Sequence, residues 1–142
     1  MNHKPYVLNN TFWVYPKLGL IKQKNPAKET TIEPRLMNLL CLLIFYNGEM
    51  VGPGLLAKKV WGDYNSSVED VAQAIVQLRE ALNDDNNKMI EAIPRQGYVM
   101  HARITDQEID ENETSPNQKK IWFAIAAALI LVVAAYFIWG GQ

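Results

Sequence analysis

Two glutamines near the middle of this sequence carry side chains suited to recognising another molecule. Gln73 and Gln77 lie within the stretch SSVEDVAQAIVQLREAL, residues 66–82. A carboxamide donates and accepts hydrogen bonds at once, so it can pair bidentately with the edge of an adenine in the major groove of DNA. Ser66 and Ser67 begin the stretch, and serine hydroxyls commonly contact phosphate. An ordinary solvated helix surface would show the same residue types, so the interpretation depends on what positions them.

The same stretch has the apolar period of an amphipathic helix. Its apolar side chains recur at the spacing of one helical face: Val71, Ile75, Leu78 and Leu82. Glu69 or Asp70 falls in the first turn, where negative charge suits the helix dipole. At about 100° per residue, each glutamine lies about 160° from Ile75. The pattern therefore predicts a helix with one buried face and an opposite face of amides and a hydroxyl.

Two further helices are predicted before it. Residues 35–46 are apolar nearly all round and follow Pro34, which indicates a buried core helix that ends at Asn47-Gly48. Cys41, in its middle, is best interpreted as a small core hydrophobe. A shorter helix is expected from Pro53 to Gly62, facing inward with Leu55, Leu56, Val60 and Trp61. Its outward Lys58 and Lys59 either meet phosphate or keep the face soluble. With a four-residue connector, 63–66, the last two helices form a helix-turn-helix candidate.

Short strands are predicted on both sides of the helices. Residues 6–32 contain four β-prone segments separated by turn-prone residues, in which Trp13 and Tyr15 are expected to pack rather than to bind a ligand. Residues 88–93 and 98–104 alternate like strands around Pro94-Arg95-Gln96-Gly97. These two segments predict a hairpin with a basic tip, like the wing of a winged helix. The fold class expected is α+β: a four-stranded antiparallel sheet, three helices and a C-terminal hairpin.

Charge divides the chain into unlike parts. Residues 1–104 hold 12 Lys and Arg against 10 Asp and Glu, a balance of +2, although the whole chain carries −1. Residues 105–118 hold five acids and no base, which is typical of a disordered connector. One cysteine excludes an intrachain disulfide, and residues 1–10 lack the apolar core of a secretion signal. The predicted domain is residues 1–104, followed by a linker with a lysine pair, 105–120.

Residues 121–139 are predicted to cross a membrane as a single helix. Nineteen uncharged residues without Pro or Gly extend about 28 Å, close to the hydrocarbon thickness of a bilayer. Ile121 and Trp122 begin the span, and Tyr136 and Trp139 lie near its other end, where interfacial aromatic residues belong. Because the lysine pair precedes the span, we expect the N-terminal domain in the cytoplasm, the anchor in the membrane, and a short tail, 140–142, outside.

The order of these elements resembles a known family. The sequence is similar to the winged-helix DNA-binding output domain of OmpR/PhoB-type two-component response regulators, and more narrowly to ToxR/CadC-like membrane-anchored transcription regulators. The similarity covers roughly residues 5–104. The motifs that carry it are IEPRLMNLLCLL (32–43), GEMV (48–51), LLAKKVWG (55–62), VAQAIVQLREAL (71–82) and IEAIPRQGYVM (90–100).

That resemblance implies a role in DNA binding for particular residues. The third helix would enter the major groove, its N-terminal serines would contact phosphate, and the wing would reach the minor groove or its backbone. Arg79 matches a family arginine, but its position near the buried face allows an ion pair as readily as a phosphate contact. With the outward lysines, the expected DNA-binding residues are Ser66, Ser67, Gln73, Gln77, Arg79, Arg95, Gln96, Lys58 and Lys59.

Departures from the family pattern temper this expectation. Glu80 stands on the outer face where relatives often carry a basic residue, and Glu69 and Asp70 add negative charge nearby. A lone copy is therefore expected to bind promoter DNA weakly and to depend on self-association or a second membrane regulator. RNA polymerase is a further partner suggested by the resemblance. The alternative function is a protein–protein interaction module that binds another regulator or polymerase.

Catalysis is not expected from this sequence. His3 and His101 are far apart in the sequence, and there is no acid pair with a positioned partner, no metal-ligand cluster and no phosphate-cradling glycine loop. We therefore expect no enzyme activity, no cofactor and no metal site.

Overall fold

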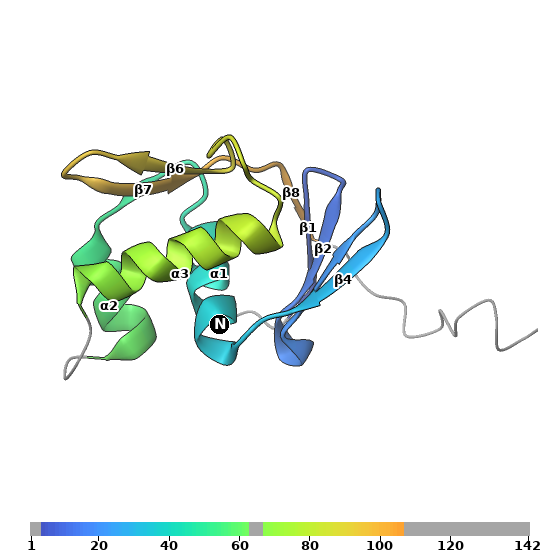
Figure 1. The fold of residues 1–142 in the computed structure, drawn as a ribbon, viewed down its shortest axis with the longest axis horizontal. Helices are drawn as coiled ribbons and strands as arrows, with labels where there is room; N and C mark the ends of the chain where they lie inside the picture. Colours follow the sequence, from blue (N-terminus) through green and yellow to red (C-terminus); the bar gives the residue numbers. More distant parts are fainter. Residues whose placement is uncertain (1–3, 63–66, 107–142) are drawn as a thin grey trace, which may run out of the picture. The chain divides into compact units, whose positions relative to one another are not determined.

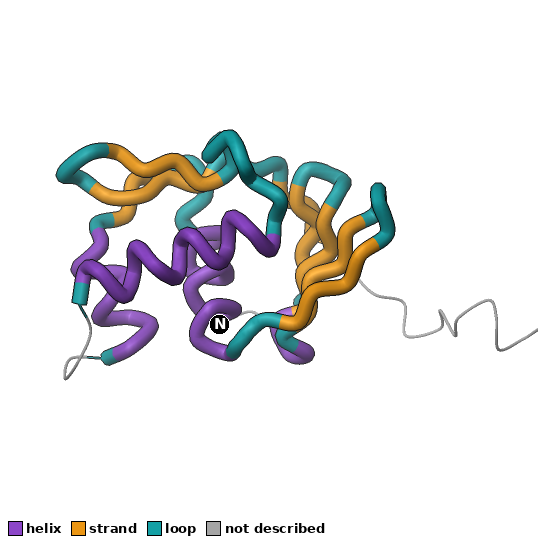
Figure 2. Tube along the Cα trace, viewed as in Figure 1, coloured by secondary structure: helices purple, strands orange, loops and turns teal. Residues whose placement is uncertain are grey.

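The structure is a computed structural model that describes residues 4–62 and 67–106 (Figure 1). Within those ranges it has the predicted α+β class, with antiparallel strands forming two sheets; the helices lie below the C-terminal hairpin and to the left of the N-terminal strands (Figure 2). No helix in the described ranges has the length and apolarity needed to cross a bilayer. Ser66, the connector beyond Asp106 and the predicted span 121–139 lie outside the described residues.

The first sheet has five strands rather than the expected four. The predicted N-terminal strands are present as β1 (Tyr6–Leu8), β2 (Phe12–Tyr15), β3 (Leu20–Gln23) and β4 (Lys28–Thr31), with a 3-10 turn, η1 (Pro16–Leu18), between β2 and β3. A fifth strand, β8 (Ile104–Asp106), pairs antiparallel with β1 and gives the order β4-β3-β2-β1-β8.

Strand β8 corrects the sequence interpretation at two points. Ile104 was expected at the end of the wing, and Thr105 and Asp106 were expected in a disordered connector. They form β8 because β1 offers an open edge, and pairing at such an edge is made by backbone groups, whatever the side chains. Asn9 fixes the position of the chain just before β8. Its side-chain Oδ1 accepts a hydrogen bond from the Arg103 backbone amide at 2.8 Å, and its backbone amide donates to the Arg103 carbonyl oxygen at 2.9 Å.

Three helices follow the N-terminal sheet in the predicted order. They are α1 (Pro34–Phe45), α2 (Pro53–Trp61) and α3 (Val68–Ala81). Helix α1 is the central core helix, with Leu39, Leu40 and Leu43 fully buried. Cys41 lies half-buried on it, and burial raises the pKa of its thiol, which agrees with a packing role.

Two apolar residues expected in the core are instead exposed. On α2, Leu55 is 41% exposed, whereas Leu56 and Ala57 are buried. The buried face of α2 therefore includes Ala57 in place of the predicted Leu55. At the end of α1, Phe45 is 78% exposed and packs edge-on against Tyr46, with ring centroids 5.0 Å apart. The helix is thus not buried all round at its last residue.

The predicted hairpin is present and gains a partner. Strands β6 (Ile90–Ile93) and β7 (Gly97–Met100) form it, and β5 (Met50–Val51) pairs with β7 to give a second sheet of order β5-β7-β6. Gly97 makes this close approach possible, because a Cβ there would lie 2.1 Å from the Val51 carbonyl oxygen. The wing tip is therefore held against the segment that leads into α2.

A buried acid sets the connection between α3 and the wing. Asp84 is only 7% exposed, and its carboxylate accepts backbone hydrogen bonds from Lys88, Met89 and Ile90 at 2.8, 3.0 and 2.8 Å. Three charge-assisted bonds to successive amides order the loop as it enters β6.

Candidate nucleic-acid interface

Helix α3 begins with a complete capping box. The Ser67 amide and hydroxyl donate to Asp70 Oδ2 at 2.9 and 3.0 Å, and the Asp70 amide donates to Ser67 Oγ at 3.1 Å. The hydrogen bonds from the Ser67 amide and hydroxyl hold the pKa of the Asp70 carboxyl below its usual value. Both donors of Ser67, which the sequence assigned to a phosphate, are thus engaged within the helix cap.

The outward face of α3 is open to solvent, as predicted. Gln73 and Gln77 are exposed, whereas the apolar stripe of the same helix is buried: Val71, Ala74, Ile75 and Leu78. Helical geometry places Gln73 and Val76 within about 30° of the direction opposite that stripe, and Gln77 about 70° from it. The exposed Glu69 and Glu80 lie about 10° from that direction, one toward each end of the helix. We call Gln73 and Val76 the outer ridge of α3.

Val76 is a site residue that the sequence interpretation missed. It is 51% exposed in the middle of the helix face. The signal was available, because a valine about 100° from Ile75 falls outside the buried stripe. An exposed apolar side chain beside an amide suits a thymine methyl group next to an adenine edge.

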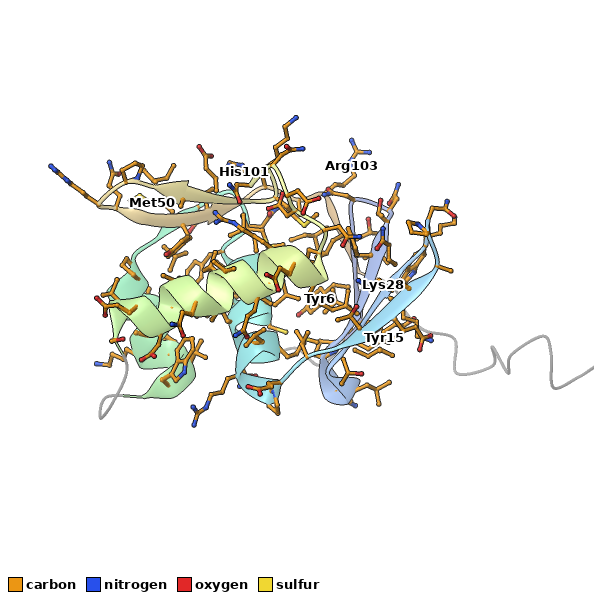
Figure 3. The ribbon with its side chains drawn as sticks, viewed as in Figure 1. Tyr6, Tyr15, Lys28, Met50, His101 and Arg103 are labelled. Carbon is orange, nitrogen blue, oxygen red and sulfur yellow. The ribbon has the colours of Figure 1, made fainter. Side chains whose placement is uncertain are left out.

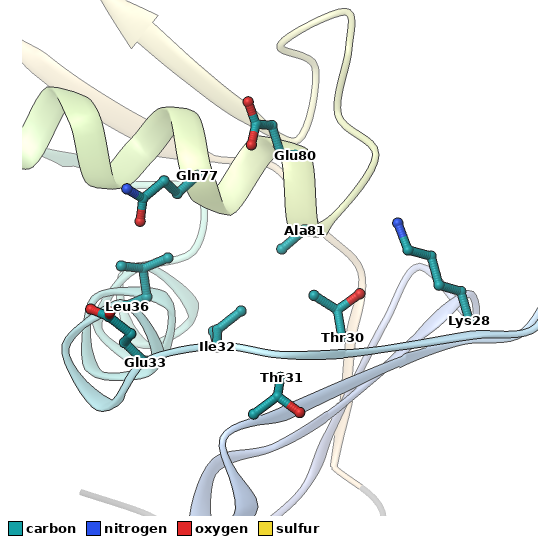
Figure 4. A pocket seen from close by; sticks show the side chains of 9 residues that line it. All are labelled: Lys28, Thr30, Thr31, Ile32, Glu33, Leu36, Gln77, Glu80 and Ala81. Carbon is teal, nitrogen blue, oxygen red and sulfur yellow. The ribbon is translucent and has the colours of Figure 1, made fainter.

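Gln77 lies in a different setting from Gln73. It borders a hollow of about 380 Å³ between α3, β4 and the start of α1 (Figure 4). The hollow is lined by Lys28, Thr30, Thr31, Ile32, Glu33, Leu36, Gln77, Glu80 and Ala81. Figure 4 shows the Gln77 amide at the rim above Leu36. Gln73 therefore lies near the outermost line of the helix, whereas Gln77 lies to one side of it.

Arg79 is held by the wing. Its Nε and Nη2 donate to the carbonyl oxygen of Ile90 at 3.1 and 2.8 Å. The partner is a backbone carbonyl, not the acidic side chain considered from the sequence. Glu69 and Glu80 are exposed on the same helix, so the solvent-facing charge of α3 is negative.

The exposed cationic side chains near α3 belong to α2 and the wing rather than to the outer face of α3 itself. Lys58 and Lys59 are exposed in the last turn of α2. At the wing tip, Arg95 and Gln96 are exposed in a turn closed by the hydrogen bond from the Gln96 amide to the Ile93 carbonyl at 3.1 Å. Arg95 has a φ of 63° there, a left-handed conformation that costs a non-glycine residue about 1–2 kcal/mol.

Helix α2 and the wing tip lie near the start of α3. A Cβ at Gly52, which caps α2, would be 3.7 Å from the Gln96 carbonyl oxygen, and Figure 1 shows α2 and the β6–β7 tip at the same end of the helix layer. Cations on two neighbouring elements thus flank the outer ridge, which has the exposed carboxylates of Glu69 and Glu80 toward its two ends. This arrangement suits phosphate contacts on either side of a groove with base contacts between them.

Metal-ligating residue types and the wing histidine are distributed as follows. No group of three or more His, Cys, Asp or Glu side chains in residues 4–62 and 67–106 could hold a metal ion. His101 pairs with Glu91 on the wing, Nε2 to Oε2 at 2.9 Å, with both side chains about half exposed.

Comparison with known proteins supplies a family. The family model described as "Transcriptional regulatory protein, C terminal" matches residues 27–100, just over half of the chain. The transcriptional activator CadC of Escherichia coli K12 is 27% identical over 113 residues, which cover 78% of this chain and 22% of that protein. Toxin coregulated pilus biosynthesis protein P of Vibrio cholerae is 26% identical over 116 residues, covering 75% and 51%.

Solved structures agree on the fold. The DNA-binding domain of E. coli CadC superposes with a TM-score of 0.64 at 24% identity, covering 75% of this chain and all of that one. The Klebsiella pneumoniae RstA DNA-binding domain, solved in complex with the RstA box, gives 0.57 at 18% identity and covers 68% and 96%. The chain spans about half or less of the two full-length relatives named above.

Proposed function

This chain belongs to the transcriptional regulatory protein C-terminal family, the OmpR/PhoB type of DNA-binding domain, and from that premise we propose that it is a membrane-anchored regulator that reads promoter DNA with α3. The observation that carries the proposal is the outer ridge: Gln73 and Val76 are exposed on a helix whose opposite stripe is buried. Such a helix can enter a major groove without rearrangement of the core.

The chemistry of the ridge favours A·T base pairs. Gln73 can pair with adenine N6 and N7, and Val76 can cover a thymine methyl group. Glu80, exposed one turn further along, can accept from a cytosine amino group and repels phosphate. The ridge thus contributes sequence discrimination more than affinity.

Affinity then depends on the flanking cations. We expect the exposed Lys58, Lys59 and Arg95 to neutralise about three phosphates, which corresponds to a shallow salt slope. A single domain would bind weakly under physiological salt. Stable occupancy of a promoter would therefore require paired copies, a second regulator or RNA polymerase beside it.

Membrane anchoring is proposed from the sequence. Residues 121–139 are long and apolar enough to span a bilayer, and the preceding lysine pair orients the domain toward the cytoplasm. The direct check is fractionation of the tagged full chain. Recovery in the inner membrane that resists alkaline extraction is expected, and recovery in the soluble fraction would refute the anchor.

The experiment for the whole proposal is genome-wide crosslinking of the tagged chain to DNA. The wild type, the variant Q73A/Q77A and a chain lacking residues 119–142 are compared. We expect discrete promoter peaks for the wild type and their loss in Q73A/Q77A at equal protein level. Identical peaks for the wild type and Q73A/Q77A would exclude base reading by these amides.

A second candidate function has its own supporting observation. The exposed acids of α3, Glu69 and Glu80, and the engagement of Arg79 by Ile90 leave the helix face without an available cation. Such a negatively charged face would suit a module that docks on a basic surface of another regulator or of RNA polymerase. Under that function, the Q73A/Q77A chain would still support regulation.

A further inference from the structure

The outer face of the five-stranded sheet carries two aromatic rings that the DNA-binding proposal does not use. Along β2 the side chains alternate: Phe12 and Val14 are buried in the core, and Trp13 and Tyr15 are half-buried on the other face. Leucines of α1 and α3 cluster with Phe12 and Val14. The Trp13–Tyr15 face is therefore the one turned away from the helices.

Lysines stand over these rings. Lys22 Nζ lies 5.7 Å from the centroid of Tyr15, and Lys24 Nζ lies 6.0 Å from that of Trp13. Lys22 also pairs with Glu29 at 2.8 Å, and this hydrogen bond raises the pKa of Lys22. A shallow hollow of about 380 Å³ is lined by Trp13, Tyr15, Lys22, Gln23, Lys24, Ala27, Lys28 and Glu29. Figure 3 labels Tyr15 and Lys28 on this sheet.

The positive charge of the described chain is concentrated in the segment that forms β1 to β4 of this sheet. Residues 4–31 contain five lysines and one glutamate, a balance of +4. The remaining described residues, 32–62 and 67–106, contain seven Lys and Arg against nine Asp and Glu, a balance of −2. A polyanionic surface would thus meet the N-terminal sheet with attraction and the rest of the domain with weak repulsion.

From this combination we propose that the outer face of the sheet docks on an anionic lipid bilayer. Half-buried Trp and Tyr rings beside exposed lysines match the composition of protein at the headgroup level, where rings enter the interface and ammonium groups meet lipid phosphates. Nucleic acid fits less well. Each ring already has an ammonium group over one face, and base stacking on that face would have to displace it.

Docking in this way orients the domain. Because the helices pack on the other face of the sheet, α3 and its outer ridge stay accessible while the sheet rests on lipid. The proposal does not depend on base reading by α3, so the two can fail separately.

The first test measures binding of residues 1–108 to vesicles. This piece is a compact unit that contains the whole described core, and it omits the predicted span, which would insert by itself. Vesicles of phosphatidylglycerol and of phosphatidylcholine are compared by cosedimentation at low salt, with thermal melts confirming that every variant is folded. Partition is expected only with phosphatidylglycerol.

Paired variants then locate the surface. Lys22 and Lys24 are the lysines that stand over the rings of this face. Each lysine near an anionic membrane contributes about a fivefold factor in partition, so K22Q/K24Q is expected to bind on the order of twentyfold more weakly. The control K59Q/K88Q makes the same charge change away from the sheet, and its partition should be nearly unchanged. Equal loss in both pairs, or no binding of the wild type, would overturn the proposal.

Fluorescence identifies the docking face independently. The W61F variant leaves Trp13 as the single tryptophan of residues 1–108. Brominated phosphatidylglycerol is expected to quench Trp13, and the K22Q/K24Q change should relieve that quenching. Absence of quenching despite partition would refute docking by this face, as would displacement of the vesicles by duplex DNA that depends on Lys22 and Lys24.

Discussion

The guanidinium of Arg79 donates two hydrogen bonds to one carbonyl oxygen, that of Ile90, at 3.1 Å from Nε and 2.8 Å from Nη2. Helix α3 is thereby joined to strand β6, the first strand of the wing. The relative position of α3 and the wing depends on this link. Arg79 is thus a positioning residue whose likeness to a family arginine does not require contact with DNA.

Replacing Arg79 should weaken the domain and its DNA binding together. We expect R79A to lower the free energy of unfolding by about 2–3 kcal/mol, since a charge-assisted link is lost and a carbonyl is left unpaired. Chemical denaturation measures this. R103A is the control, because Arg103 is exposed and its hydrogen bonds to Asn9 are made by its backbone. Equal effects of the two changes would contradict the positioning role.

Gly97 should tolerate no side chain. A Cβ there would lie 2.1 Å from the Val51 carbonyl oxygen, and that backbone belongs to β5 and cannot move alone. G97A is expected to cost about 3 kcal/mol and to lower the Tm by more than about 10 °C. G54A is the matched control, because nothing lies within 4 Å of its Cβ in α2. A Tm for G97A near that of the wild type would rule out the close approach.

The α3 cap predicts a pH dependence. Hydrogen bonds from Ser67 depress the pKa of Asp70 below its ordinary 3.8. A carboxyl with a depressed folded pKa stabilises the fold above its unfolded pKa, and that contribution is lost as the pH falls through the folded value. An NMR titration of the Asp70 carboxyl should show S67A moving its pKa back toward 3.8. An unchanged pKa in S67A would show that the cap is not responsible.

The outer ridge predicts a measurable response to one methyl group on DNA. After a binding site has been selected from random DNA, each thymine is replaced by deoxyuridine in turn. Loss of the methyl at the contacted position should weaken binding about fourfold, the value of one buried methyl group, and V76A should abolish that difference. A V76A domain as sensitive to the replacement as the wild type would exclude Val76 as the contact.

Much of this fold follows from local pattern. The four N-terminal strands, the three helices and the hairpin were predicted because period, proline and glycine act within a few residues of each other. The order of these motifs also predicted the OmpR/PhoB-type family, which the match over residues 27–100 confirms. The exposure of Gln73 and Gln77 followed from helical geometry alone.

What escaped prediction depends on contacts between distant segments. Strands β5 and β8 arise where a short stretch meets an open sheet edge, and neither carries a strand-like pattern of its own. The burial of Asp84 depends on three amides of the following loop rather than on its neighbours Asn83 and Asp85. Arg79 was predicted near the buried face, where it lies. Its partner, however, is a backbone carbonyl group, and such a partner cannot be predicted from residue types.

The central claim, that the outward face of α3 reads base edges, is tested most directly by a specificity ratio. Affinities of the full chain and of Q73A are measured for the selected site and for unrelated DNA at one salt concentration. The account predicts that the ratio of the two affinities falls at least tenfold in Q73A, while affinity for unrelated DNA is unchanged. An unaltered ratio, or equal losses on both DNAs, would contradict it.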